Sequence, residues 1–150
     1  MFFVLLALAA AKPPPPPPLP EPPPVVEPGG PASVAGMVPV TTPSGLVYYV
    51  LRAGAGPTPL PGQTVAVHYT GWLATGLKFD SSVDRGVVFT FPVGANKVIK
   101  GWDEGVSTMH VGELRQLRIP AALGYGEKGA GGMIPAGADL VFDVELIELR

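Results

Sequence analysis

The sequence predicts an α+β domain in which a twisted antiparallel β-sheet wraps half around one short α-helix. Residues 98–106 carry apolar side chains at nearly helical spacing, so we expect a short helix with one covered face. The segments on both sides of it alternate apolar and polar residues with a period of two, which indicates strands with one apolar face. A sheet that curls over the helix buries both apolar faces at once.

Composition excludes several classes of function. The chain has 150 residues, enough for one domain and a tail, and its 10 Lys and Arg against 12 Asp and Glu give no basic stripe for nucleic acid. It has no cysteine, which rules out disulfides, a thiol nucleophile and a thiolate metal site. Its two histidines, His68 and His110, are too isolated for a metal site, and we expect no metal and no cofactor.

Residues 1–11 contain a short apolar run that ends in three alanines before Lys12. The run is too short to span a bilayer, so we expect no stable membrane span. It matches the hydrophobic region and small-residue cleavage site of a secretory signal, although positive residues before it are missing. We therefore predict export to the periplasm or cell envelope, with a disordered leader on a cytoplasmic protein as the alternative.

Residues 12–40 form a linker dominated by proline. Proline fixes φ and lacks an amide donor, so this tail builds neither helix nor sheet and favours extended, disordered polyproline II. We predict a semi-rigid spacer. Two other interpretations are open: a ligand for proline-recognising domains, and a pseudo-substrate for the chain's own domain.

Residues 41–150 form the folded domain. Val65, Val67 and Tyr69 share the covered face of one strand, and His68 points the opposite way. We expect a connection at 71–77 with a hairpin turn at Thr75-Gly76, and a bulge or loop at 82–86. Residues 94–96 should cap the helix, and residues 120–135 form a glycine-rich loop. The predicted strands cover residues 46–51, 65–70, 78–81, 87–92, 113–119 and 140–146.

Five motifs stand in a fixed order along this domain. They are His68-Tyr69-Thr70-Gly71, Lys78-Phe79-Asp80-Ser81-Ser82, the helical stretch 98–106, Gly124-Tyr125-Gly126 and the final strand from Leu140 to Leu146. Together they resemble the FKBP family of peptidyl-prolyl cis-trans isomerases, in its bacterial, single-domain, exported type. The resemblance runs from about residue 42 to residue 150 and implies the same α+β architecture.

The resemblance implies a proline-binding cleft with Trp102 at its centre. Each aromatic residue alone could equally be an ordinary core residue, but their occurrence together favours a binding site. Asp80, Tyr125 and Trp102 are the predicted catalytic residues; the hydroxyl of Tyr125, expected free at the rim of its loop, and the backbone N–H of Ile99 would donate to ligand carbonyls. The predicted substrate-binding residues are Tyr69, Phe79, Arg85, Phe89, Val98, Ile99 and Phe142. Tyr69 and Arg85 are also the expected partners of the Asp80 carboxylate, which needs such donors when buried.

The implied reaction breaks no covalent bond. Amide resonance sets a rotation barrier of about 18–20 kcal/mol. Binding the twisted amide better than the planar one by about 4 kcal/mol would accelerate rotation roughly a thousandfold. No general base is required, and the sequence contains no Ser-His-Asp, Cys-His or paired-carboxylate arrangement.

The chain departs from many family members at one loop, where Ala130-Gly131 stands in place of His-Pro and Gly124 in place of alanine. This makes the loop barer and more mobile. We expect a monomer whose partners are proline-containing polypeptides and macrocycles of the FK506 or rapamycin kind. The alternative function is a non-catalytic module that binds proline-containing segments, and a folding chaperone is a weaker third hypothesis.

Overall fold

The computed structural model describes residues 30–130 and 133–150. The predictions for residues 1–29, which include the apolar run and most of the proline-rich linker, lie outside the described residues, as does Gly131. Within the described parts the elements follow one another as β1 Val40–Thr41, β2 Val47–Arg52, β3 Thr64–Leu73, β4 Lys78–Ser81, α1 Ser82–Arg85, β5 Phe89–Pro92, α2 Lys100–Ser107, β6 Leu114–Ile119 and β7 Leu140–Leu149. Two 3₁₀ turns, Ala121–Leu123 and Gly126–Lys128, precede β7.

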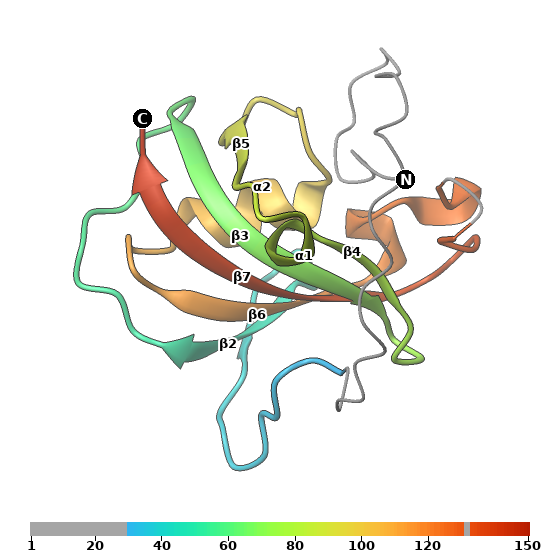
Figure 1. The fold of residues 1–150 in the computed structure, drawn as a ribbon. Coiled ribbons are helices and arrows are strands. Elements are labelled where there is room, and N and C mark those ends of the chain that lie inside the picture. The colour runs from blue at the N-terminus through green and yellow to red at the C-terminus, as the bar shows by residue number, and fades with distance from the viewer. Residues whose placement is uncertain (1–29, 131–132) are drawn as a thin grey trace.

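The sheet is antiparallel and runs in the order β1-β2-β6-β7-β3-β4, with β5 also paired to β3. β4 and β5 share one edge of β3: Thr70 pairs with Ser81 of β4, and Val67 pairs with Phe89 of β5. The chain between them, which includes α1, therefore lies beside the middle of β3. Figure 1 shows the sheet curving under α2, which lies across its concave face. This confirms the predicted architecture.

Helix α2 lies close to the sheet because two of its glycines face β6. A Cβ atom at Gly101 would approach the side chain of Ile119 to 2.7 Å, and one at Gly105 would approach Leu117 to 2.8 Å. Real Cβ atoms avoid such distances, so any larger residue would force the layers apart. The close approach buries Trp102 and Val106 completely against the apolar faces of β3, β6 and β7.

Two local predictions were wrong. Residues 82–86, expected to bulge or loop, contain the helical turn α1, because the Ser81 hydroxyl accepts the Asp84 N–H at 3.2 Å and Gly86 ends the turn at φ 72°. The connection predicted at 71–77 begins only after Leu73, because β3 stays paired with β7 as far as Leu73. The turn at Thr75-Gly76 lies where it was predicted, closed by the Leu73 N–H and the Leu77 carbonyl.

The loop before α2 does not cap the helix with a side chain. Ile99 occupies the N-cap position and makes no side-chain cap, so the helix begins at Lys100 rather than at residue 98. Instead, a side chain of the helix binds the loop backbone. The Asp103 carboxylate of the first turn accepts the N–H groups of Gly94 at 2.9 Å and Asn96 at 3.1 Å. The helix thus fixes the loop that leads into it.

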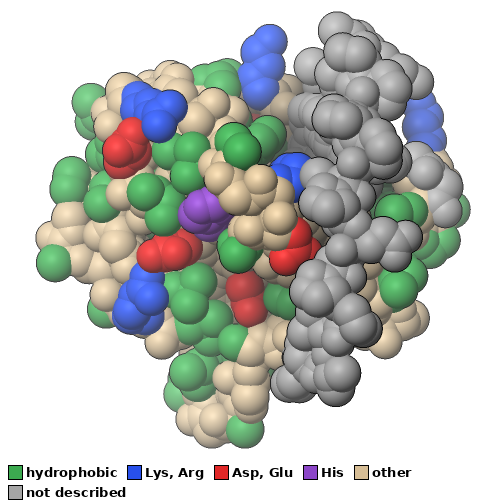
Figure 2. Space-filling model, viewed as in Figure 1, with side chains coloured by type: hydrophobic (Ala, Val, Ile, Leu, Met, Phe, Trp, Pro, Cys, Tyr) green, Lys and Arg blue, Asp and Glu red, His purple; other side chains and the backbone are tan. Residues whose placement is uncertain are grey.

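Lys and Arg side chains lie among Asp and Glu side chains on the face that Figure 2 shows, without forming a patch of one sign. This distribution agrees with the near balance of charges in the sequence. Among the described residues, no helix is both long enough and apolar enough to cross a membrane.

Candidate active site

An aromatic cluster surrounds Trp102 on the concave side of the sheet. The Trp102 ring lies 4.9 Å from Tyr69, 5.3 Å from Phe142, 5.6 Å from Phe91 and 5.9 Å from Phe89, measured between ring centroids. The contacts with Tyr69, Phe89 and Phe142 are edge-to-face, the arrangement that the ring quadrupoles favour. Rings from β3, β5 and β7 thus meet the indole of α2 in one place.

The alternation of side chains along the strands explains this convergence. Tyr69 follows Val65 and Val67 on the covered face of β3, and Phe142 is on the covered face of β7. Gly71 leaves room for the cluster, since a Cβ atom there would lie 2.6 Å from the Phe142 ring and 2.8 Å from Phe79. A side chain at this position would push two of the rings apart.

The other predicted wall residues lie at the margins of the cluster. Phe79 of β4 packs its ring against Phe142 at 5.5 Å and reaches Trp102 through it. Val98 and Ile99 are buried directly before α2, and the Ile99 carbonyl accepts the Trp102 and Asp103 N–H groups. The fold therefore brings every predicted apolar residue to the same side of the sheet.

Asp80, Tyr69 and Arg85 form a polar network beside these rings. The Tyr69 hydroxyl donates to one Asp80 carboxylate oxygen at 2.5 Å, and Arg85 forms an ion pair with the other oxygen. Arg85 also donates to the Tyr69 hydroxyl at 3.0 Å. Asp80 lies on β4, one residue before the strand ends at Ser81, and Arg85 lies on α1, which follows directly. The short helix that the sequence did not predict therefore positions Arg85 in this network.

Burial controls the protonation of these groups. It raises the pKa of Asp80, against the opposing effects of the Tyr69 hydrogen bond and the Arg85 charge. It also raises the pKa of Tyr69, and the charge and hydrogen bond of Asp80 raise it further. Tyr69 is therefore a neutral hydrogen-bond donor at neutral pH.

Two donors in this region have no acceptor within the described part of the chain: the indole N–H of Trp102 and the hydroxyl of Tyr125, both buried. Tyr125 was expected to hold its hydroxyl at the rim of its loop. Its ring packs against the core instead, and its hydroxyl is buried. Burial raises the Tyr125 pKa, with smaller contributions from Tyr69 and Asp80, which lie near it.

Two supporting residues were missed by the sequence analysis. Phe91 contacts Trp102 and stacks on Phe89 at 5.7 Å; its position two residues after Phe89, on the same face of β5, was a usable signal. The Ser82 hydroxyl accepts the Tyr69 N–H at 2.8 Å and contacts His68 Nδ1 at 2.9 Å. Ser82 ends one of the five motifs, but no sequence pattern indicated its contacts with residues 13 and 14 positions away.

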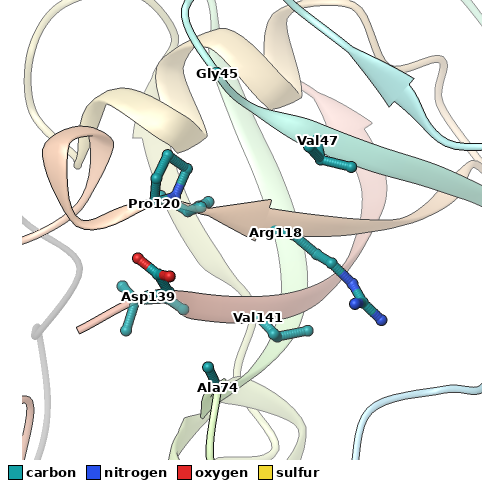
Figure 3. A pocket seen from close by; sticks show the side chains of 9 residues that line it. Gly45, Val47, Ala74, Arg118, Pro120, Asp139 and Val141 are labelled. Atoms are coloured by element: carbon teal, nitrogen blue, oxygen red, sulfur yellow. The ribbon is translucent and has the colours of Figure 1, made fainter.

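A separate cavity of about 330 Å³ opens on the other side of the sheet, where β6 ends and β7 begins. Figure 3 shows Arg118 and Asp139 on its walls beside Val47, Val141 and Pro120. It contains none of the aromatic residues around Trp102, so it is not part of the cluster.

Comparison with known proteins identifies the family. The sequence profile of the FKBP-type peptidyl-prolyl cis-trans isomerases matches residues 56–147. The chain belongs to this family. The match includes all ten of the predicted site residues, from Tyr69 to Phe142.

Individual family members agree with this assignment. The FK506-binding protein of Neisseria meningitidis serogroup B is 50% identical over 105 residues, which cover 70% of this chain and 96% of the relative. The FKBP-type peptidyl-prolyl cis-trans isomerase FkpA of Aeromonas hydrophila is 54% identical over 110 residues, 73% of this chain and 40% of that protein. The crystal structure of AtFKBP13 superposes with a TM-score of 0.71 at 40% identity, covering 75% of this chain and 99% of the other.

Proposed function

We propose that this protein accelerates rotation about X-Pro bonds in polypeptides by binding the twisted amide non-covalently against Trp102. The two buried donors on Tyr125 and Trp102, which have no acceptor among residues 30–130 and 133–150, are the observation that supports this most directly. A buried donor left unpaired costs about 1–3 kcal/mol. A ligand carbonyl that accepts from either donor would recover that free energy when it binds.

The residues around Trp102 suit this reaction. Water stabilises the planar amide through its large dipole, and the rings of Tyr69, Phe89 and Phe142 would exclude that water from the bound proline. Tyr69 is held by Asp80 and Arg85, so its ring forms a fixed wall. A donor that meets the carbonyl better in the twisted geometry than in the planar one lowers the barrier. Asp80 thereby acts as a positioning residue.

The test is isomerisation of an X-Pro tetrapeptide by the full chain, with several residues before proline. We expect acceleration that falls in Tyr125→Phe and in Asp80→Asn, with circular dichroism showing that both variants fold. Asp84→Asn is the matched control, because Asp84 is exposed and pairs with Lys78 instead. No acceleration by the folded protein across the panel would overturn the proposal; saturable peptide binding in that case would support the non-catalytic module.

We also propose that the site around Trp102 binds macrocycles of the FK506 kind. The Neisseria relative is named for binding FK506. FK506 should compete with the tetrapeptide at Trp102, and unaffected isomerisation at saturating FK506 would contradict this.

The apolar run in residues 1–11 makes the periplasm or cell envelope the proposed location. Fusion of residues 1–40 to a reporter that is active only after export tests it, with a fusion of residues 12–40 as control.

A further inference from the structure

A row of polar side chains crosses the convex face of the sheet, on the side opposite α2. Strand register aligns its members: Gln116 pairs with Tyr49 and Asp143, and Asp143 pairs with Thr70. Gln116 at its centre is fully buried, which is unusual for an amide side chain. A buried amide requires partners for its donors and its acceptor.

The partners of Gln116 come from both sides of the row and from the linker. Arg118 Nε donates to Gln116 Oε1 at 3.0 Å, which fixes the orientation of the amide. Gln116 Nε2 then donates to Asp143 Oδ1 at 3.0 Å and to the backbone carbonyl of Ala32 at 2.8 Å. The Ala32 N–H donates to Asp143 Oδ2 at 2.9 Å. Both backbone polar groups of Ala32 are thereby bound by one pair of side chains.

The segment that follows Ala32 is closed at its other end as well. A turn joins the Met37 N–H to the Val34 carbonyl at 2.9 Å, with Gly36 at φ 81°. Val40 then pairs with Tyr48 at the start of the sheet. In Figure 1 this segment lies beneath the sheet, on the side away from α2.

We propose that Gln116 and Asp143 form a docking site for the backbone at Ala32, which fastens residues 32–39 to the convex face. The site recognises an extended residue through its N–H and C=O, as a neighbouring strand would. Pro31, directly before Ala32, lacks an N–H and so could not occupy this site itself. The proline-rich tether therefore leaves the domain at Ala32, behind the sheet, rather than at β1 where the sequence placed the domain boundary.

Two substitutions test the site from opposite sides. Asp143→Asn replaces one of two acceptor oxygens by a donor, so one contact is lost. Ala32→Pro removes the N–H without changing the domain. The matched controls are Glu145→Gln, on the same face of β7 but paired with Arg52, and Ala35→Pro, at the turn position where proline is favoured. Ala35→Pro also removes an N–H, but one that donates only to the Ser33 hydroxyl at 3.3 Å and not to the sheet.

The measurement is the heteronuclear ¹⁵N NOE of residues 33–38 in the full-length protein. We expect values close to those of the sheet in the unsubstituted protein and in both controls, and lower values in both test variants. Exchange of the Ala32 amide should accelerate in Asp143→Asn by about twofold to tenfold, as for loss of one exposed hydrogen bond. Isomerisation of the tetrapeptide should stay unchanged, so this result is independent of the proposed activity.

Either of two results would overturn the proposal. Low NOE values for residues 33–38 in the unsubstituted protein would show that the segment is not docked. Equal NOE values in Asp143→Asn and Glu145→Gln, together with unchanged NOE values in Ala32→Pro, would show that Gln116 and Asp143 do not hold the segment.

Discussion

The hydroxyl of Tyr125 contributes nothing that the described fold requires. It is buried and has no acceptor among the residues that the structure describes, so its removal relieves a desolvation cost rather than breaking a contact seen there. We expect Tyr125→Phe to leave the free energy of unfolding unchanged or to raise it by about 1 kcal/mol. The same variant should lose roughly tenfold in kcat/KM, the effect of one hydrogen bond made only in the transition state.

Chemical unfolding and tetrapeptide kinetics on one preparation measure both quantities. A loss of stability with full activity would show that the hydroxyl is structural and would refute its assigned role.

Asp80 has the opposite role, because Tyr69 and Arg85 both depend on its carboxylate. Asp80→Asn leaves the half-buried guanidinium of Arg85 beside a neutral amide. Removing one partner of a buried ion pair costs about 3–5 kcal/mol; Arg85 is 19% exposed and asparagine keeps one acceptor, so we expect about 2 kcal/mol. Asp84→Asn, at an exposed pair, should cost less than about 0.5 kcal/mol in the same urea titration. Equal losses in the two variants would refute the special position of Asp80.

Tyr69 and Tyr125 make stability depend on pH in the alkaline range. Burial raises the pKa of both phenols in the folded protein, whereas an unfolded tyrosine loses its proton near pH 10. The stability they contribute is fully present below about pH 10 and falls above it by about 1.4 kcal/mol per pH unit for each tyrosine. Urea unfolding at several pH values should show this decrease in the free energy of unfolding. In Tyr125→Phe the slope should be smaller by the contribution of one tyrosine. An unchanged slope in that variant would contradict the raised pKa of Tyr125.

At the level of elements, the packing of α2 on β6 depends on the absence of side chains at Gly101 and Gly105. Alanine would favour an isolated helix by about 1 kcal/mol, but in this position its Cβ would overlap three atoms of Ile119. We expect Gly101→Ala to destabilise the fold by about 1–3 kcal/mol, because overpacking outweighs propensity. Lys100→Ala, exposed on the same helix, should change stability by less than about 0.5 kcal/mol.

Thermal and urea unfolding of the two variants make the comparison. A gain in stability in Gly101→Ala would mean that helix and sheet can move apart at little cost.

Local patterns predicted most of these elements. Alternation along β3, β5 and β7 placed Tyr69, Phe89 and Phe142 correctly, since a strand buried on one face has a period of two. Helix α1 was missed because four residues give no periodicity, although Ser81 and Gly86 were usable cap signals. The network of Asp80 could be predicted because a buried carboxylate needs donors, and Tyr69 and Arg85 were the candidate donors near it. The pairing of Gln116 and Asp143 with Ala32 could not, because it joins residues up to 111 positions apart that no periodic pattern connects.

The sheet has a concave face with the aromatic cluster and a convex face with the linker, and each face carries one of the two tryptophans. Trp102 lies in the aromatic cluster, whereas Trp72 pairs with Val141 and so shares the convex face of the sheet. Titration with a proline-containing peptide or FK506 should therefore change the fluorescence of Trp102 alone. We expect Trp72→Phe to keep the full change and Trp102→Phe to lose it. A response that persists in Trp102→Phe and disappears in Trp72→Phe would place the ligand behind the sheet, beside the linker rather than in the cleft.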